Sequence, residues 1–134
     1  MASGIVGNTG SSTSVSAPAE RVPGLLVLRF DGQLYTANIR SANRRIVAAV
    51  DAAEPRPELV VVDATAVAVL TVTVIHEFQQ IEHELLTRGV ELWIAALPPR
   101  SLATARKTPR WAEMEAAGRL HPTALAAVQQ FRTR

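Results

Sequence analysis

The sequence contains no cysteine, which excludes disulfide bonds, thiolate metal sites and a cysteine nucleophile. Aromatic side chains are also scarce, with two Trp, one Tyr and three Phe among 134 residues. The three histidines, His76, His83 and His121, lack the spacing of metal ligands, so we expect no metal site. The formal net charge is only +2, and the basic residues form no recognised motif, so we expect no nucleic-acid partner.

The sequence also lacks the short motifs that mark common catalytic sites. It has no Gly-rich loop followed by Lys-Ser or Lys-Thr, no Gly-x-Gly-x-x-Gly and no Gly-x-Ser-x-Gly. His76 and Glu77 are neighbours on a predicted helix, so their side chains point in different directions and do not form a dyad. We therefore expect a binding protein and not an enzyme.

One segment, Leu59–Ile75, could be mistaken for a membrane span. It is short, contains Asp63 and three threonines, and is rich in β-branched residues, so a buried strand followed by a loop and a helix explains it better. The first 20 residues are small and polar and show no periodicity. They predict a flexible tail or linker over residues 1–20, with a single domain over residues 21–134.

Hydrophobic periodicity predicts an alternation of strands and helices. Short apolar runs bounded by turn residues indicate strands, whereas apolar residues three or four positions apart indicate helices. The predicted strands are Leu25–Phe30, a short one at Gln33–Thr36, Leu59–Asp63 and Val90–Leu97. The predicted helices begin near Asn38, Thr71, Thr108 and Leu120, and the last carries Leu125, Val128 and Phe131. This order predicts an α/β fold in which a small, mostly parallel sheet of about four to five strands packs with about four to five helices.

The junction after the strand at Leu59–Asp63 is the most informative place in the sequence. In an open α/β sheet, ligands meet the loops at the carboxyl ends of strands, where helix N-termini expose unpaired N–H groups. Thr71 or Thr73 can cap the helix that follows, and such an end can receive a phosphate or an acidic group of a partner. The alternative is that Thr71 is only a cap and that Val67, Val69 and Leu70 are core residues.

We take nine residues at this end of the predicted sheet as candidates for binding a nucleotide or a partner. They are Arg29, Asp31, Thr65, Ala66, Val67, Leu70, Thr71, Val72 and Thr73.

Segments spread along the chain resemble, in their order, the STAS domain, which occurs in sulfate transporters and anti-sigma-factor antagonists. Asp63–Val67, followed by an apolar turn into a helix, is similar to the family's signature. Pro23–Asn38 resembles the SulP transporter subgroup more specifically, and Gly89–Ala95 and Thr123–Leu125 are similar to a later strand and helix of the family. The resemblance covers about Val22–Phe131.

The resemblance implies a STAS fold and a regulatory, protein-interaction domain of a SulP-type sulfate or anion transporter, held at the cytoplasmic face of the membrane. The implied partners are the membrane part of its own transporter and other cytoplasmic proteins. No cofactor is required, but GDP, GTP or ATP is an implied ligand of the loop after Asp63. The alternative is a free-standing protein that binds a partner as the anti-sigma-factor antagonists do.

The chain departs from the family pattern at the start of the helix after this loop. The family's Asp-Ser or Asp-Thr pair falls on Thr71 and Val72, so Val72 occupies the position of the serine that is phosphorylated in anti-sigma-factor antagonists. Valine cannot be phosphorylated, which argues against partner switching through this position. Thr71 and Thr73 keep hydroxyl groups nearby, although capping is the expected role of Thr71. The loss of the acidic residue leaves this helix start more receptive to an anion.

Overall fold

The structure is a computed structural model that describes residues 4–6, 15–17, 22–34 and 36–134. Its strands are β1 (Gly4–Val6), β2 (Val15–Ala17), β3 (Leu25–Phe30), β4 (Leu59–Asp63), β5 (Glu91–Ala95) and β6 (Leu120–His121). Its helices are α1 (Ile39–Ala52), α2 (Val72–Thr87), α3 (Pro99–Arg106), α4 (Pro109–Ala116) and α5 (Ala124–Arg132). No helix in this described part is long and apolar enough to cross a membrane.

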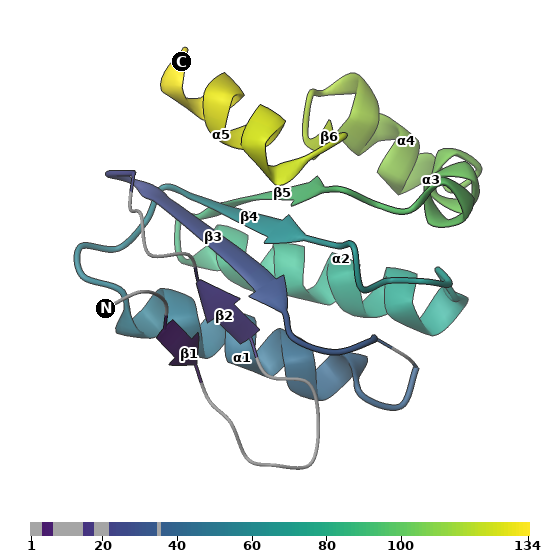
Figure 1. Ribbon diagram of the computed structural model, residues 1–134, viewed down its shortest axis with the longest axis horizontal. Coiled ribbons are helices and arrows are strands. Elements are labelled where there is room, and N and C mark those ends of the chain that lie inside the picture. Colours follow the sequence, from purple (N-terminus) through teal and green to yellow (C-terminus); the bar gives the residue numbers. More distant parts are fainter. Residues whose placement is uncertain (1–3, 7–14, 18–21, 35) are drawn as a thin grey trace.

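The six strands form one sheet in the order β1-β2-β3-β4-β5-β6. Strands β3 to β6 are parallel to one another. Strand β2 pairs antiparallel with β3, and β1 pairs antiparallel with β2. Figure 1 shows three layers, with α1 and α2 beneath the sheet and α5 above it. The predicted α/β fold, with a small, mostly parallel sheet and about five helices, is therefore confirmed.

Two predictions about individual elements are wrong. Gln33 and Leu34 do not form a strand, because Leu34 makes a single backbone bond to the loop after β4, from its N–H to the Ala66 carbonyl (3.1 Å); Tyr35 lies outside the described residues. Leu120–His121, predicted as the start of the last helix, is instead the edge strand β6 beside β5. The helix begins only after Thr123, whose hydroxyl caps it by accepting the Ala126 N–H (3.0 Å).

The sheet extends upstream of residue 21, which was the expected start of the ordered domain. Within residues 1–20, β1 and β2 pair with each other, and β2 pairs with β3 through Val15 with Phe30 and Ser16 with Arg29. The prediction of a flexible tail does not hold for these two strands, which are held by backbone hydrogen bonds that hydropathy patterns do not reveal. For the rest of residues 1–20 the prediction lies outside the described residues.

The core divides into two clusters because side chains alternate between the two faces of the sheet. In β4 every residue of Leu59–Val62 is fully buried. Val60 and Val62 face the larger cluster, which lies between the sheet and helices α1 and α2. Leu59 and Val61 face the smaller cluster, which lies between the sheet and α5. Among the described helices, α5 alone contributes to the second cluster, through Ala127 and its partly buried neighbours.

Helix α2 packs on the sheet through the stripe that its periodicity predicts. Val74, Phe78, Ile81 and Leu85 are all buried in the larger cluster. The Phe78 ring meets the buried Trp111 ring of α4 edge to face, with centroids 5.7 Å apart. This aromatic pair fixes α4 against α2.

A buried carboxylate reinforces the same junction. The Glu82 side chain of α2 is only 5% exposed and accepts hydrogen bonds from Arg110 of α4 (Nη2–Oε1, 2.7 Å) and from Arg119 (Nη1–Oε2, 3.5 Å). The hydrogen bond to Glu82 raises the pKa of Arg110. Because Arg119 directly precedes β6, Glu82 links α2, α4 and the edge strand.

Replacing Glu82 with alanine is expected to lower the free energy of unfolding by about 2 kcal/mol, because both guanidinium groups lose a buried acceptor. The matched control is Glu113→Ala, which removes a carboxylate that lies 3.5 Å from the same Arg110 but is 70% exposed. It should cost under about 0.5 kcal/mol in urea unfolding. Equal losses for the two variants would contradict the role given to Glu82.

Candidate functional site

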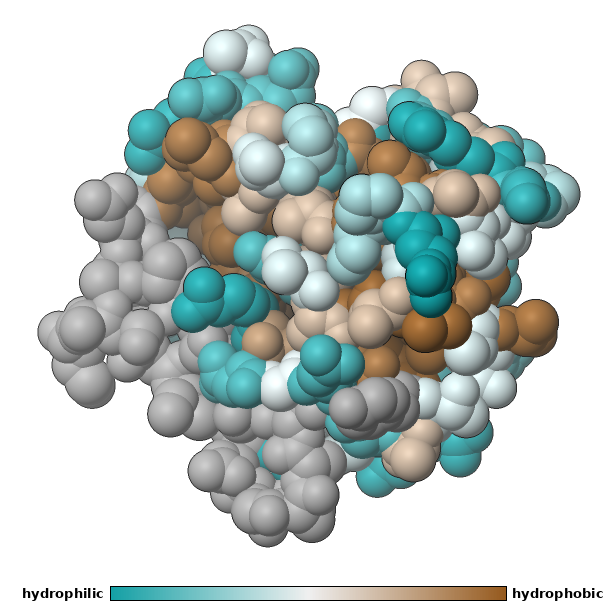
Figure 2. Space-filling view, turned by 45° about the vertical axis from the view of Figure 1, so that its right-hand side comes forward, coloured by the Kyte–Doolittle hydropathy of each residue, from teal (hydrophilic) through white to brown (hydrophobic). Residues whose placement is uncertain are grey.

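The candidate site lies where the parallel strands end and the following helices begin. The starts of α1, α2, α3 and α5 each follow a strand of the parallel sheet, and none has an acidic residue in its first turn. We call residues 29–32, 64–73 and 96–100 the carboxyl-end surface. Figure 2 turns this end of the molecule toward the viewer and shows apolar side chains in brown among hydrophilic ones in teal.

Hydrogen bonds hold the loop after β4 at both of its sides. Asp63 Oδ1 accepts from the Thr65 N–H (3.0 Å) and from the Thr65 hydroxyl (2.6 Å), which closes a tight turn. The Ala64 N–H donates to the Ala95 carbonyl (2.7 Å), and the buried Ser101 hydroxyl of α3 donates to the Val67 carbonyl (2.7 Å). The loop from β4 to α2 is therefore held in place by hydrogen bonds to the end of β5 and to α3.

Thr71 caps α2, as one of the two sequence interpretations predicts. Its Oγ1 accepts the Val74 N–H at 3.2 Å and lies 3.1 Å from the hydroxyl oxygen of Thr36. One of the unpaired N–H groups of the helix start is thus already satisfied inside the protein.

The cap leaves two large apolar side chains exposed beside it. Val72, the first residue of α2, is 83% exposed, and Val69 in the preceding loop is 54% exposed. Thr73 is also exposed, so the position of the family's phosphorylated serine lies on an open and partly apolar surface. We call Val69, Val72 and Thr73 the α2 tip.

The structure divides the nine predicted site residues into three groups. Those exposed at the carboxyl-end surface are Arg29, Asp31, Thr65, Val72 and Thr73. Ala66 and Thr71 are partly buried, whereas Val67 and Leu70 are core residues, in agreement with the second sequence interpretation. The same interpretation is wrong for Val69, which it placed in the core and which is 54% exposed, because the apolar sequence of this loop does not show which side chains turn outward.

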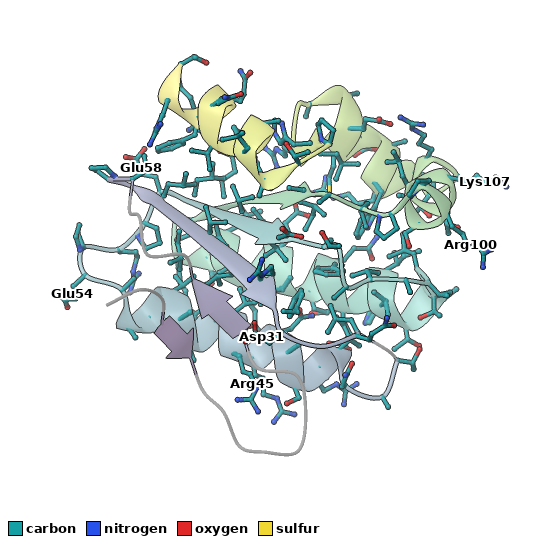
Figure 3. The ribbon with its side chains drawn as sticks, viewed as in Figure 1. Asp31, Arg45, Glu54, Glu58, Arg100 and Lys107 are labelled. Atoms are coloured by element: carbon teal, nitrogen blue, oxygen red, sulfur yellow. The ribbon has the colours of Figure 1, made fainter. Side chains whose placement is uncertain are left out.

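Both ends of the sheet carry exposed charged groups. Figure 3 shows Arg100 and Lys107 projecting from the region of α3 at the carboxyl-end side, with Glu54 and Glu58 on the opposite side of the molecule. Arg29 is likewise exposed, at the end of β3. In the described part of the chain, no group of three or more His, Asp or Glu side chains is placed to hold a metal ion.

Parallel register brings a second set of residues together on the α5 side of the same end. Arg29, Asp63, Ala95 and His121 are aligned across β3 to β6. The His121 ring lies against the Trp93 ring, with centroids 4.7 Å apart. Its Nε2 is buried and has no hydrogen-bond partner among the described residues, and burial lowers the pKa of His121, partly opposed by a hydrogen bond with the Gly118 backbone.

The sequence model described as the STAS domain matches residues 16–121 of the chain. Two curated relatives, each named a probable sulfate transporter and found in two strains of Mycobacterium tuberculosis, are 30% identical over 116 residues. That alignment covers 87% of this chain but 20% of each relative. The chain therefore spans about a fifth of the length of these relatives.

Solved structures with the same fold include domains and whole transporters. A sulfate transporter family protein from Wolinella succinogenes matches with a TM-score of 0.64 and 18% identity, covering 86% of this chain and 91% of that one. The SulP transporter STAS domain from Vibrio cholerae matches with a TM-score of 0.61 and 14% identity, covering 87% of this chain and 91% of that one. The murine Solute Carrier 26 family member A9 anion transporter matches with a TM-score of 0.75 and 11% identity, covering 97% of this chain and 22% of the transporter. At these identities the likeness shows the fold.

His121 should make the free energy of unfolding depend on pH. Its pKa in the folded chain is below the ordinary value of 6.5, so the unfolded chain takes up the proton more readily. The stability that neutral His121 contributes is fully present above pH 6.5, the ordinary pKa, and decreases as the pH falls below it toward the lower pKa of the folded chain. His121→Phe, which keeps a ring on Trp93, should flatten the difference between urea unfolding at about pH 7.5 and about pH 5.5.

The reference for this prediction is the unsubstituted chain, unfolded in urea at the same two pH values. An unchanged pH dependence in His121→Phe would show that another group is responsible.

Proposed function

The chain belongs to the STAS domain family, and from that premise we propose that it is the regulatory and docking domain of a SulP-type anion transporter. Both curated relatives are named as probable sulfate transporters, and this chain corresponds to only a fifth of their length. In the murine anion transporter a domain of the same fold likewise makes up 22% of the chain. These proportions support a domain that works beside a membrane part; its place on the cytoplasmic side is part of the proposal.

The observation that carries the docking proposal is the exposure of the α2 tip. Val72 is 83% exposed, so its side chain contributes almost nothing to the core. Burial against a partner would remove this apolar surface from water, worth up to roughly 1.5 kcal/mol for a valine. The backbone on either side of Val69 is held by the Thr71 cap and by the hydrogen bond from Ser101 to Val67. Little conformational entropy would therefore be lost when a partner binds the α2 tip.

The same tip supports a contact that is not switched by phosphorylation at its centre. Anti-sigma-factor antagonists carry a phosphorylatable serine where this chain has Val72, and Thr71 already uses its hydroxyl as a cap. A permanent apolar contact suits a domain tethered to its partner better than a free-standing protein that must release one. We therefore favour the transporter domain over the free-standing alternative; Thr73, with its exposed hydroxyl, is the neighbouring position open to modification.

A purine nucleotide is a second candidate ligand of this end. The observation in its favour is that α2 begins without an acidic residue in its first turn, with Arg29 and Arg100 exposed at the same end of the sheet. Val67 and Leu70 are buried, so a base would have to lie on the exposed part of the tip. This leaves GDP, GTP or ATP as ligands held mainly through phosphate.

Val72→Asp should weaken binding of the domain to the membrane part of its transporter by about tenfold or more, because a carboxylate would be buried in an apolar contact. An acidic residue in the first turn of a helix stabilises it, so loss of binding would not reflect loss of folding. The measurement is capture of the detergent-solubilised membrane part by immobilised domain.

The matched control is Leu86→Asp, which places the same charge at an exposed apolar residue (49% exposed) near the other end of α2. It should change the affinity by less than about twofold. Equal weakening by both variants, or none by Val72→Asp, would show that the α2 tip is not the docking surface.

An amide chemical-shift titration with GDP, GTP and ATP tests the nucleotide proposal. Binding should give saturable shifts confined to residues 29–32, 64–75 and 97–100, and Arg29→Gln should weaken them by about tenfold through loss of one phosphate contact. The control is Arg56→Gln, an exposed arginine in the loop before β4. No shifts at millimolar nucleotide would leave this end of the domain to protein partners.

A further inference from the structure

Helix α3 carries two cations that have no ion-pair partner among the residues that the structure describes. Arg100 lies in the first turn of α3 and Lys107 is its C-cap, and both side chains are exposed. By contrast, Arg106 of the same helix pairs with Glu115 of α4 (Nη2–Oε2, 3.0 Å). One cation of this helix is thus paired inside the protein, whereas the other two are open to a partner from outside.

The two open cations lie on one face of α3. They are seven residues apart, which corresponds to two helical turns, or about 10 Å along the axis. Between them on the same face are Ala103 and Thr104, whose side chains are small. We call Arg100, Ala103, Thr104 and Lys107 the α3 strip. It is a face without large side chains between two positive charges.

The α3 strip adjoins the α2 tip. Ser101, the neighbour of Arg100, is fully buried and donates its hydroxyl hydrogen bond to the Val67 carbonyl (2.7 Å), two residues before Val69 of the tip. Figures 1 and 3, which share one view, show Arg100 and Lys107 at the same end of the molecule as the start of α2. Exposed apolar side chains and open cations therefore belong to one surface.

The segments that form the tip and the strip contain no acidic residue. Neither Asp nor Glu occurs at residues 64–76 or at residues 96–112. The carboxylates that come next in the sequence each have a partner inside the protein within 3.5 Å; they are Asp63, Glu77, Glu91 and Glu113. A partner that covers this surface must therefore bring the negative charge itself, because a cation that is buried without a counter-charge is strongly unfavourable.

An anionic lipid surface fits these observations less well than a protein does. Electrostatic attachment to a bilayer depends on clusters of about four to eight Lys or Arg side chains, and the α3 strip carries two open cations. Two charges at a fixed spacing beside a small apolar contact suit a protein surface, on which complementary charges set the orientation of the partner.

From these observations we infer that the partner surface at the α2 tip is an acidic protein segment. It presents two carboxylates about two helical turns apart, which pair with Arg100 and Lys107, beside an apolar patch that covers Val69 and Val72. The inference rests on the proposed docking function and specifies the chemistry of the partner. The apolar contact supplies affinity, and the two ion pairs fix how the domain is oriented on the membrane part of its transporter.

Lys107 is the only lysine in the sequence, which allows a direct test. A zero-length carbodiimide cross-link joins an amine to a carboxylate as an amide, so it forms only where the two groups touch. In a mixture of the chain with the detergent-solubilised membrane part, mass spectrometry should find Lys107 joined to an Asp or Glu of the membrane part. Lys107→Arg keeps the charge and should keep the affinity within about twofold while losing this cross-link. Cross-links through the terminal amine alone would overturn the inference.

Neutral variants measure what each cation contributes to binding. When the immobilised chain captures the membrane part, Arg100→Gln and Lys107→Gln should each weaken the affinity by about tenfold. Raising NaCl from about 50 mM to about 500 mM should weaken the unsubstituted chain and have a smaller effect on the double variant. Arg44→Gln and Arg56→Gln, which change exposed arginines on α1 and in the loop before β4, are the matched controls and should change the affinity by less than about twofold.

The possible results separate this inference from the docking function on which it rests. If Val72→Asp weakens capture while Arg100→Gln and Lys107→Gln do not, the α2 tip is the docking surface and the acidic partner is overturned. No capture of the unsubstituted chain would overturn the docking function and this inference together. Binding of the chain to protein-free vesicles of phosphatidylglycerol and phosphatidylcholine, lost in the same two neutral variants, would show that the cations meet lipid and would also overturn it.

Discussion

The structure depends on one strand that is buried on both of its faces. The four residues Leu59–Val62 of β4 are fully buried. Their side chains alternate between the cluster that packs against α1 and α2 and the cluster that packs against α5. Each such side chain removed from water contributes roughly 1.5–3 kcal/mol. Because β4 pairs with β3 on one side and β5 on the other, its position determines the register of the parallel sheet.

The same constraint shapes the end of the domain that carries the candidate site. A strand that carries apolar side chains on both faces has no solvent-facing side, so polar chemistry can begin only where the strand ends. Asp63 marks that point and closes the turn with Thr65, after which the loop must send Val67 and Leu70 into the core and Val69 outward. Thr71 caps the helix that follows, and Val72, its first residue, is left exposed.

Much of this could be predicted from the sequence, for identifiable reasons. The run at β4 and the stripe of α2 are strong local patterns, and both are present as predicted. The burial of Glu82 was not predictable, because its partners Arg110 and Arg119 are 28 and 37 positions away and only the fold brings them together. The two-residue strand β6 and the short strands β1 and β2 are likewise too brief for periodicity and depend on the edges they meet. The nine candidate residues lie together at the carboxyl end of the parallel strands, and which of them face solvent depends on turns that the sequence pattern does not encode.

Helix α5 differs from the other helices in being the sole described cover of its face of the sheet. It has nine residues and its own threonine cap, and it contributes one fully buried side chain, Ala127. Because its buried contacts belong to a cluster separate from that of α1, α2 and α4, a local opening of α5 would leave the larger cluster intact. Opening of this kind would appear in hydrogen exchange as a unit that loses protection before the rest of the domain. It would uncover Trp93 and the β4 side chains Leu59 and Val61, which α5 covers in the structure.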